Sequence, residues 1–481
     1  MSVRSCPSFL THGLSRNERQ KVRGAFRLVQ KHLSNIQRRT GISYAEHGTR
    51  VALALREISN DATLTAVALI HDIFLLPNGN ELLKKIHCTK EERHLARSMH
   101  ELRRLHIDAN THDLDRVIAA FSSDERLLLL RMAHRLNDVR HLNLFIPALQ
   151  KAIARETLHM YTSIAGRLGM HALRYEMEDI CFRFLQPRIA KNLEQRMREC
   201  HPLDMVCIRH AERFLKLKMR THCIPCRMTY RIKGLYSTYR KMALKERRFE
   251  ELTDRLALRL IVPSVEDCYR TLGIVHNVMH PIPGKLKDYI GAPKENGYRS
   301  IHSVTFPLPG VTEQPIEIQI RTEEMDKECE YGVLNHTDYK HFLYTLRTQQ
   351  TRVQLFRNLE SLRHEARSPK QFETALRTYF DDNHLALFDA KNNLYHLKEP
   401  VTALDFVCHA FGKRSAFLRS VRINGREQPM DSLLHDGDTV EPRFGRKHIM
   451  KIYWTAFCRS SFALNLLKEL CERRSSSQLA K

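Results

Sequence analysis

The sequence lacks the features of a membrane-spanning or secreted protein. None of its windows approaches about 18 consecutive apolar residues without a charge, the length that a helix needs to cross a bilayer. The first twenty residues carry scattered Arg and no apolar stretch, so we expect no secretory signal. These absences predict a cytoplasmic protein with no membrane partner.

A disulfide framework is also missing. The 12 cysteines show no paired pattern, which favours reduced thiols that behave as small hydrophobic residues. Cys223 and Cys226 have the spacing of a redox motif, but neither a second close pair nor a thioredoxin-like setting accompanies them. We therefore do not assign a redox or zinc function to this pair.

Acidic residues are too few to balance the basic ones. The chain has 78 Lys and Arg against 54 Asp and Glu, which gives a formal net charge of +24 and a pI of about 9.7. Such an excess attracts polyanions such as nucleotide phosphates, RNA or membrane surfaces. A basic but passive surface is the alternative, because charge alone selects a class of partner and no chemistry.

Glycine and proline are sparse in the first half, where apolar residues recur at helical spacing. After about Arg227, short apolar strands alternate with helices, and a third unit of strand and helix texture starts near Asp381. A chain of 481 residues predicts two to four domains, and no long internal repeat is present. We divide it into residues 1–200 (helical), 201–340 (mixed α/β), 341–380 (helical connector), 381–445 (β-grasp-like) and 446–481 (helical tail).

Three polar residues interrupt the apolar helical patterns of the first half. His47 is followed 24 residues later by the pair His71-Asp72. Neutral imidazole and carboxylate groups from two helices can gather a divalent cation such as Mn²⁺, which activates water against a phosphate ester. The residues thus predict a metal-dependent phosphohydrolase site. Three polar residues on solvated helix faces are the alternative.

The mixed half begins with a candidate phosphate cradle. Arg231, Lys233 and Lys241 bracket the start of a helix that carries Ser237 in its first turn, and cations beside free helix N–H groups suit a triphosphate. Asp254 opens the next apolar strand, where its carboxylate could hold Mg²⁺ on phosphate oxygens. Basic helix starts are common surface features, so the cradle alone is a weak signal.

A second group of polar residues follows within the same half. Tyr298 could stack on a purine base while Asn296 reads its edge and Lys294 meets phosphate. In the run Glu317-Ile-Gln-Ile-Arg321, a period of two puts the polar side chains on one face of one strand, pointing into a common cleft. We favour a functional site over a solvent-facing strand.

These residues resemble the RelA/SpoT alarmone synthetase/hydrolase family. The most specific segments are LKDYIGAPKENGYRSIHS, IEIQIRT and KAIARETLHMYTSIAGRLGMHALRYEMEDICFRFLQP. The resemblance runs from about Arg38 to beyond Val440, in the family's order of HD, synthetase and TGS (β-grasp) domains. The resemblance implies an α+β multidomain chain with a helical HD-type bundle, a nucleotidyltransferase-like synthetase domain and a small TGS domain. It also implies transfer of pyrophosphate from ATP to the 3′-hydroxyl of GDP or GTP, in the stringent response.

The resemblance assigns roles to individual positions. Glu317 falls at the catalytic carboxylate and, with Asp254, at the Mg²⁺ ligands. The ATP-binding positions are Arg231, Lys233, Ser237, Lys241 and Arg259. The GDP- or GTP-binding positions are Lys287, Lys294, Asn296, Tyr298, His302 and Gln319. One departure is Gly234, where the family often has His.

The HD half departs further from the family. Arg38, His47, His71 and Asp72 match hydrolase positions, but His134 stands where the family has Asp. The acidic pair expected after Asp72 is replaced by apolar residues and Pro77. We therefore predict a degenerate HD site that has lost hydrolysis but retains residual Mn²⁺ binding.

Two alternatives to a synthetase stay open. One is an Mn²⁺-dependent (p)ppGpp hydrolase, suggested by the histidines. The other is a non-catalytic binder of the ribosome or of uncharged tRNA, suggested by the charge and by His409, which lies near the family's tRNA-end contact in the TGS-like segment. A structural β-grasp with a solvated His409 is the plainer interpretation of that segment.

Overall fold

The computed structural model describes residues 5–86, 88–102, 124–167, 170–245, 248–252, 255–293, 298–331, 384–391, 393–435, 437–445 and 451–479. The chain divides into two compact units, Met1–Asp288 with Asn296–Phe380, and Tyr289–Glu295 with Asp381–Lys481. Each unit has a hydrophobic core of its own. The connector predicted over 341–380 lies outside the described residues.

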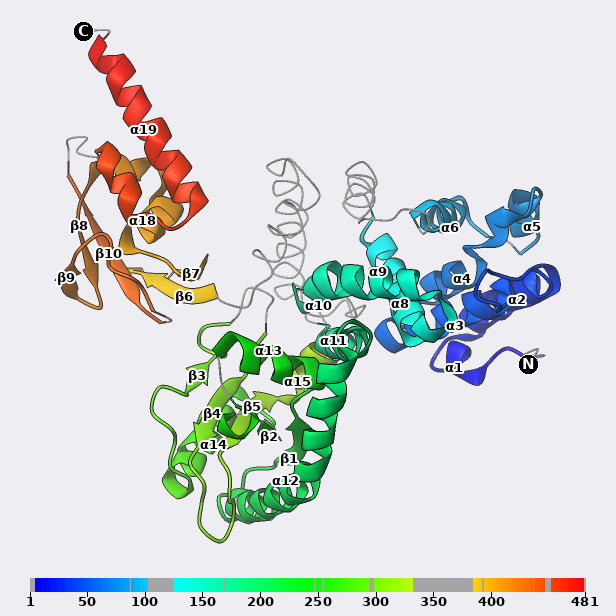
Figure 1. Cartoon of the computed structure of the whole chain (residues 1–481), viewed down its shortest axis with the longest axis horizontal. Coiled ribbons are helices and arrows are strands. Elements are labelled where there is room, and N and C mark those ends of the chain that lie inside the picture. Colours follow the sequence, from blue (N-terminus) through cyan, green and yellow to red (C-terminus); the bar gives the residue numbers. More distant parts are fainter. Residues whose placement is uncertain are drawn as a thin grey trace. The chain divides into compact units, whose positions relative to one another are not determined.

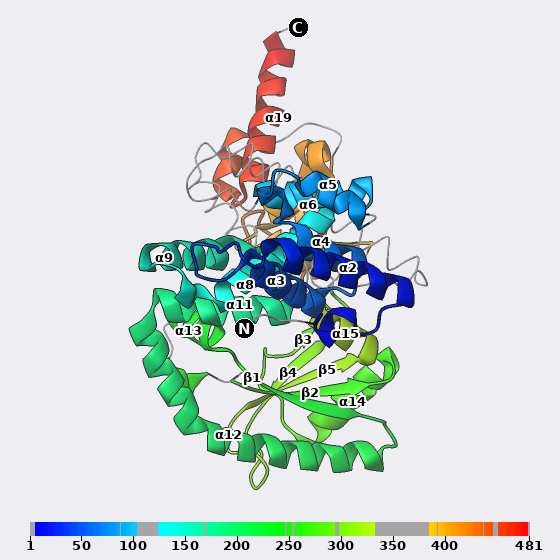
Figure 2. The same ribbon diagram turned by 90° about the vertical axis from the view of Figure 1, so that its right-hand side faces the viewer.

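The first unit begins with a bundle of helices (Figures 1 and 2). They are α1 (Ser8–Thr11), α2 (Arg16–Leu33), α3 (Tyr44–Ile58), α4 (Ala62–Ile70), α5 (Gly79–Lys85), α6 (Lys90–Leu102), α8 (Glu125–Arg140), α9 (Pro147–Glu156), α10 (Thr162–Arg167) and α11 (His171–Leu185). α3 packs against α4 and α8, and the apolar stripes of these helices share one core. Asp61 caps α4 by accepting the backbone N–H groups of Thr63 and Leu64.

The apolar pattern predicts one helix over Leu64–Leu75, but α4 ends at Ile70. Ile73–Leu75 forms a separate 3₁₀ turn instead. Pro77 prevents a helix from continuing past Leu76, because proline cannot donate a backbone N–H and disfavours helical geometry in the residue before it, but it lies seven residues beyond Ile70 and does not explain the earlier end. The break places His71 and Asp72 at the end of α4, where both side chains are fully buried.

The second part of the first unit is a mixed sheet in the order β1-β2-β5-β4-β3. Its strands are β1 (Arg227–Ile232), β2 (Leu256–Val262), β3 (Lys287–Asp288), β4 (Ile301–Thr305) and β5 (Ile316–Thr322). β2 and β5 are parallel, and the other neighbours are antiparallel. The helices around it are α12 (Pro187–Thr221), α13 (Leu235–Lys245), α14 (Val265–Val278) and α15 (Glu323–Tyr331).

The two faces of this sheet differ in character. α12 and α14 pack against the strands, and α12 runs along the sheet in both ribbon views (Figures 1 and 2). Alternate residues such as Leu258, Leu260 and Ile318 form its buried apolar side. The boundary predicted at residue 200 falls inside α12.

The second unit is a five-stranded mixed sheet with the helix α18 (Ala403–Phe411) packed beside it. Its strands are β6 (His384–Asp389), β7 (Leu394–Lys398), β8 (Leu418–Ile423), β9 (Arg426–Gln428) and β10 (Thr439–Phe444), in the order β7-β6-β10-β8-β9. Thr402 and Asp405 form a capping box at the start of α18. The helix α19 spans Ser461–Leu479, and Trp454 packs into the same core as Phe406.

Candidate functional site

The polar face of the first unit's sheet carries the predicted nucleotide-site residues in register. Directly opposed residues of neighbouring strands point to the same side of a sheet, as do alternate residues along one strand. One row across the strands consists of Lys287, His302, Gln319 and Arg259. The next row holds Glu317, which lies opposite Ala257, and Arg231, which also lies opposite Ala257. The structure thus brings together residues up to 88 positions apart, Arg231 and Gln319, on one surface.

Three of these side chains, His302, Glu317 and Gln319, close a polar ring with Arg321 and Tyr298. Arg321 Nη2 donates to Tyr298 Oη and to Gln319 Oε1, both at 3.1 Å. Tyr298 Oη lies 2.7 Å from His302 Nε2, and His302 Nδ1 lies 3.1 Å from Glu317 Oε1. Gln319 Nε2 donates to Glu317 Oε2 at 2.9 Å. The tautomer with hydrogen on His302 Nδ1 satisfies every member.

The hydrogen bonds of the polar ring all point in one direction, from Arg321 to Glu317. Arg321 only donates and Glu317 only accepts, so both arms of the ring deliver hydrogen bonds to the Glu317 carboxylate. Burial raises the pKa of Tyr298 far above its usual range, which keeps the phenol a donor. The ring therefore holds the Glu317 carboxylate by a hydrogen bond at each of its two oxygens.

Three residues that the sequence interpretation did not assign complete this site. The Arg231 guanidinium lies 4.2 Å from the ring centre of Tyr175, and His171 meets Tyr298 edge-on at 5.5 Å, both from α11. Asp326 of α15 pairs with Arg259 at 3.2 Å. The helical segment that contains His171 and Tyr175 was itself one of the specific signals, but its spacing could not show that it reaches the sheet.

The predicted phosphate cradle is occupied by a carboxylate from the helical bundle. Asp179 of α11 accepts the backbone N–H groups of Leu235 and Tyr236 at 3.3 and 2.8 Å, in the first turn of α13. Ser237 and Lys241 follow on the same helix, one turn apart, and both are partly buried. A helix N-terminus that binds a carboxylate has the donors and the dipole that also suit a phosphate.

Three predicted residues lie outside the described residues: Asp254, Lys294 and Asn296. Their approach to Glu317 or Tyr298 therefore stays a prediction. Lys233 is partly buried, and its backbone N–H donates to Arg255 O. Lys287 lies in β3, exposed and paired with His302.

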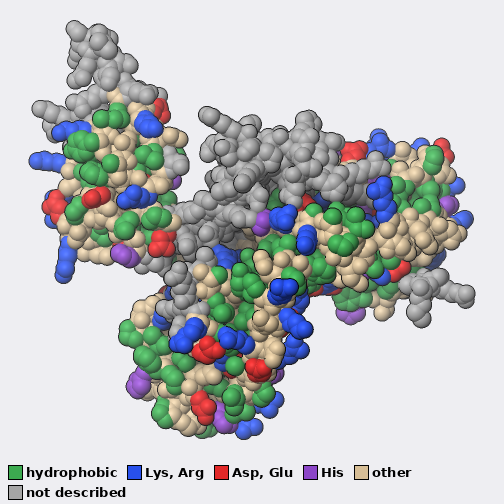
Figure 3. Space-filling view, in the orientation of Figure 1, with side chains coloured by type: hydrophobic (Ala, Val, Ile, Leu, Met, Phe, Trp, Pro, Cys, Tyr) green, Lys and Arg blue, Asp and Glu red, His purple; other side chains and the backbone are tan. Residues whose placement is uncertain are grey.

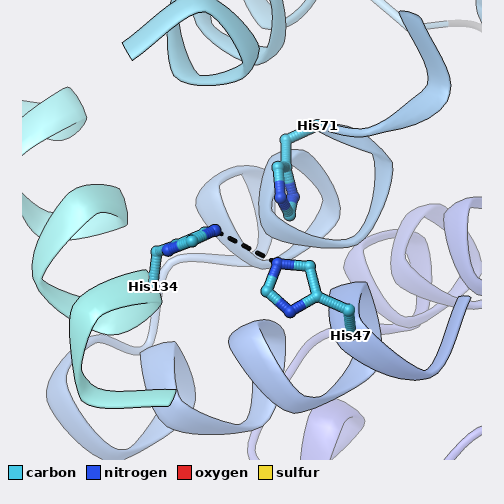
Figure 4. Close-up of side chains that lie close together, drawn as sticks. All are labelled: His47, His71 and His134. Atoms are coloured by element: carbon cyan, nitrogen blue, oxygen red, sulfur yellow. Dashed lines mark hydrogen bonds between the residues drawn. The ribbon is translucent and has the colours of Figure 1, made fainter. Parts of the chain in front are cut away.

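A second polar site lies inside the helical bundle. The histidine cluster consists of His47 from α3, His71 at the end of α4 and His134 from α8 (Figure 4). One ring nitrogen of each lies within 4.8 Å of those of the other two, and the pair His47 Nε2 and His134 Nε2 is 3.1 Å apart. His134, which the sequence interpretation treated as a lost ligand, therefore joins the cluster.

Carboxylates and a guanidinium surround the histidine cluster. Asp72 Oδ2 lies 3.3 Å from His71 Nε2 and 4.0 Å from His47 Nε2. Arg38 Nη1 lies 2.6 Å from His47 Nδ1, so four of the predicted positions meet His134 in one place. Burial lowers the pKa of His47 well below its usual range, with a further lowering from His134, and burial also lowers the pKa of His134. Neutral imidazoles are metal ligands, so the donor set fits a divalent cation.

In the second unit, the residue predicted to have a functional role is His409. His409 is an exposed residue of α18, where Nε2 lies 3.3 Å from Ser460 Oγ and the ring contacts that of Phe462 at 4.4 Å. Lys and Arg side chains are spread over the face drawn in Figure 3 rather than gathered in one patch. Among the described helices, none is both long enough and apolar enough to span a membrane.

Comparison with known proteins assigns both parts of the first unit. Residues 230–343 match the family model described as "Region found in RelA / SpoT proteins", and residues 25–171 match an HD domain model, together more than half of the chain. The chain is 30% identical over 463 residues to the "Bifunctional (p)ppGpp synthase/hydrolase SpoT" of Escherichia coli (strain K12), covering 95% of this chain and 65% of that protein.

Two further similarities have narrower coverage. The "GTP pyrophosphokinase rsh" of Brucella suis is 30% identical over 422 residues, which cover 86% of this chain and 56% of that protein. The chain thus spans less than two thirds of the length of these curated relatives. A solved small alarmone synthetase 1 from Bacillus subtilis, bound to its product pppGpp, is 25% identical and covers 36% of this chain and 97% of its own, but the TM-score of 0.26 supports no structural argument.

Proposed function

Because the chain belongs to the RelA/SpoT family, we propose that it synthesises (p)ppGpp from ATP and GDP or GTP in the cytoplasm. The observation that carries the proposal is the polar ring, which aims two hydrogen bonds at one strand-borne carboxylate, Glu317, beside the cations of the same sheet face. Curated relatives named as a (p)ppGpp synthase/hydrolase and as a GTP pyrophosphokinase support the same reaction class.

In the proposed reaction the acceptor's 3′-hydroxyl oxygen attacks the β-phosphorus of ATP. A bond forms between that oxygen and the β-phosphorus, the bond from the β-phosphorus to the α-phosphate oxygen breaks, and AMP leaves. Glu317 takes the hydroxyl proton, since a ribose hydroxyl is a poor nucleophile that needs a positioned base. His302 and Gln319 hold the carboxylate in place, so its orientation does not have to be acquired during the reaction.

Cations on the same face suit the charge of the transferred group. Arg231 and Arg259 project from neighbouring strands, and we propose that they, with Lys233, Ser237 and Lys241, bind the ATP phosphates. Asp254 and Glu317 would hold Mg²⁺, since carboxylate oxygens are the donors this ion prefers, and the ion supplies further charge neutralisation when bound.

On the acceptor side we propose that Tyr298 stacks on guanine. Lys287, Lys294 and Asn296 would contact the same nucleotide, with His302 and Gln319 beside its ribose. Because His171 contacts the Tyr298 ring, a guanine base stacked on Tyr298 would have to share that ring with His171 or displace the His171 side chain.

The proposal is tested with purified full-length chain, labelled ATP, GDP or GTP, and Mg²⁺. We expect a 3′-pyrophosphorylated guanine nucleotide and one AMP for each product molecule. Glu317→Gln should lower kcat by at least about 10²-fold while nucleotide binding persists. Glu313→Gln, the same change at an exposed position four residues earlier, is the control and should keep full activity. Absence of product from the wild-type protein, with and without ribosomes, would refute the proposal.

The histidine cluster supports a second candidate activity, the metal-dependent release of pyrophosphate from (p)ppGpp. Three histidines of the cluster could hold a metal ion, but the residues after Asp72 include no acid before Pro77. We propose that hydrolysis is lost for want of that acidic pair. Metal-dependent pyrophosphate release by wild-type protein, abolished in His71→Ala, would instead establish the hydrolase.

For the second unit we propose a TGS-type partner surface for uncharged tRNA or the ribosome, with His409 as the contact. The support is the resemblance of its helix and the mixed sheet of the second unit. Salt-sensitive binding of uncharged tRNA that His409→Ala weakens would bear this out. Equal binding by both proteins would leave His409 a structural contact of Ser460 and Phe462.

A further inference from the structure

We propose that the histidine cluster, together with Asp72, is a four-donor centre selective for Zn²⁺ rather than for Mn²⁺ or Mg²⁺. Three of its four donors are imidazole nitrogens. They come from α3, from the residue that directly follows α4, and from α8 (Figure 4). The inference concerns a site separate from the polar ring and does not depend on the proposed synthesis.

The kind of donor decides the choice of ion. Mg²⁺ and Mn²⁺ favour carboxylate, carbonyl and water oxygens, usually six of them, whereas imidazole nitrogens suit Zn²⁺, Co²⁺ and related ions. Three histidines plus one further ligand form a common four-coordinate zinc shell. His47, His71 and Asp72 are fully buried and His134 is 4% exposed, so an ion there would be held mainly by protein donors.

The spacing of the donors suits a small four-coordinate shell. With zinc–ligand bonds of about 2.0–2.1 Å, neighbouring donors of a tetrahedron lie about 3.3 Å apart. The pair His47 Nε2 and His134 Nε2 is 3.1 Å apart, and Asp72 Oδ2 is 3.3 Å from His71 Nε2. His47 Nε2 lies 4.0 Å from Asp72 Oδ2, and the ligand nitrogens of the three histidines all lie within 4.8 Å of one another, so closing the shell needs side-chain shifts of up to about 1.5 Å.

Groups behind two of the histidines already fix the tautomer that metal binding requires. His71 Nδ1 lies 2.7 Å from Ala68 O, and His134 Nδ1 lies 3.1 Å from Asp138 Oδ2. The bond to Ala68 O places the hydrogen of His71 on Nδ1, and the nearby Asp138 carboxylate favours the same tautomer for His134. In this tautomer the lone pair of each Nε2 is available to an ion in the cluster. A carboxylate or carbonyl behind a ligating histidine is the usual support of a metal site.

His47 needs one rearrangement, and Asn137 can supply it. Arg38 Nη1 and the amide nitrogen of Asn137 now lie 2.6 and 3.3 Å from His47 Nδ1. The Asn137 amide oxygen is buried and has no hydrogen-bond partner among the residues that the structure describes. Turning the amide by half a revolution brings that oxygen to Nδ1, where it would accept its hydrogen. Asn137 is thus a positioning residue for His47. Metal binding would release Arg38 from its contact with the His47 imidazole.

Metal binding itself tests the inference. Full-length protein stripped with a chelator is titrated with Zn²⁺, Co²⁺ and Mn²⁺ against a chromophoric competitor, and the visible spectrum of the Co²⁺ form is recorded. We expect one equivalent of Zn²⁺ and the intense bands of four-coordinate Co²⁺. His134→Asp should reduce the preference for Zn²⁺ over Mn²⁺ by at least about tenfold, because it restores an oxygen donor. Asn137→Ala should weaken Zn²⁺ binding by about tenfold or more.

His94→Asp makes the same substitution at an exposed position of α6 and should leave the preference unchanged. Circular dichroism of the stripped proteins shows whether each variant folds. The weak bands of six-coordinate Co²⁺, an unchanged preference in folded His134→Asp protein, or no bound metal would each overturn the proposal. If His134→Asp does not fold, the Co²⁺ spectrum and the stoichiometry of wild-type protein still decide it.

Discussion

The histidine cluster and the polar ring of the same unit differ in how the chain brings their side chains together. The cluster takes one residue from each of three helix segments, separated by 24 and 63 positions, and buries them in an apolar bundle. The polar ring draws three members from alternate positions of one strand, β5, and two from the segment that enters and forms β4. Helices gather a few isolated donors, whereas strands in register gather a row.

The two sites also differ in what they already satisfy. Every bond of the polar ring runs from Arg321 towards Glu317, so its side chains hold one another without a ligand. In the cluster, neighbouring imidazoles such as His47 and His134 face one another with lowered pKa values. An ion bound between these imidazoles would join all three. The comparison indicates a preorganised anion-processing site and a separate cation site.

The largest predicted effects test whether these sites are independent. Glu317→Gln should reduce synthesis by at least about 10²-fold and leave Zn²⁺ binding unchanged. His71→Ala should abolish stoichiometric Zn²⁺ binding and change synthesis by no more than about threefold, as distant sites usually act additively. Measuring both activities on both variants checks this. A large loss of synthesis in His71→Ala protein would show that the sites are coupled and would break the comparison.

Two variants of Tyr298 separate its proposed stacking on the guanine base from its hydrogen bonding in the polar ring. Tyr298→Ala should raise the KM for GDP by about 5- to 150-fold, which corresponds to the ~1–3 kcal/mol of base stacking. Tyr298→Phe keeps the aromatic face but removes the bonds to Arg321 and His302, so it should lower kcat more than it changes KM. Steady-state kinetics distinguish the two. Tyr230→Ala, on the other face of β1 and 52% exposed, is the control.

How far the sequence predicts these sites depends on the range of the contacts. The alternation in β5 is a local property, and the prediction that Glu317, Gln319 and Arg321 share a face is confirmed by their hydrogen bonds. Arg321 is nevertheless only 2% exposed and belongs to the buried network rather than to an open cleft. The approach of Tyr175 to Arg231 could not be predicted, because residues on one helix carry no local signal of the strand they will meet.

His134 shows a second limit of sequence reasoning. Comparing residue types suggested a lost ligand, since imidazole had replaced a carboxylate. Whether a different donor still reaches the centre depends on side-chain length and helix position, and the 3.1 Å contact with His47 could only come from the structure. The helix end at Ile70 was likewise missed, because the apolar pattern continues through Leu75 although the backbone does not.

A smaller effect is expected where the helical bundle contacts α13. Asp179→Asn removes a negative charge from the helix end proposed for ATP phosphates, so the KM for ATP should fall by about two- to fivefold. The free energy of unfolding should change by no more than about 1 kcal/mol, because Asn remains a good cap. Kinetics and urea unfolding measure these quantities. Asp267→Asn makes the same change in the first turn of α14 and should leave the KM for ATP unaltered. A raised KM for ATP would place the phosphates elsewhere.

The smallest effect is expected from the surface contact of α11 with α8 and α3. Arg140 of α8 bonds to Glu57 of α3 and Glu176 of α11 at 2.6–2.8 Å, but its side chain is 28% exposed. Because water screens such pairs, Arg140→Met should reduce the free energy of unfolding by only about 1 kcal/mol. Arg135→Met, five residues earlier, should cost about 3–5 kcal/mol, since it leaves Glu156 charged and buried. Urea unfolding of both variants gives the ratio. Equal losses would mean that the exposed network stabilises the bundle as strongly as the buried pair does, and that α11 is held to α8 more firmly than its exposed contacts imply.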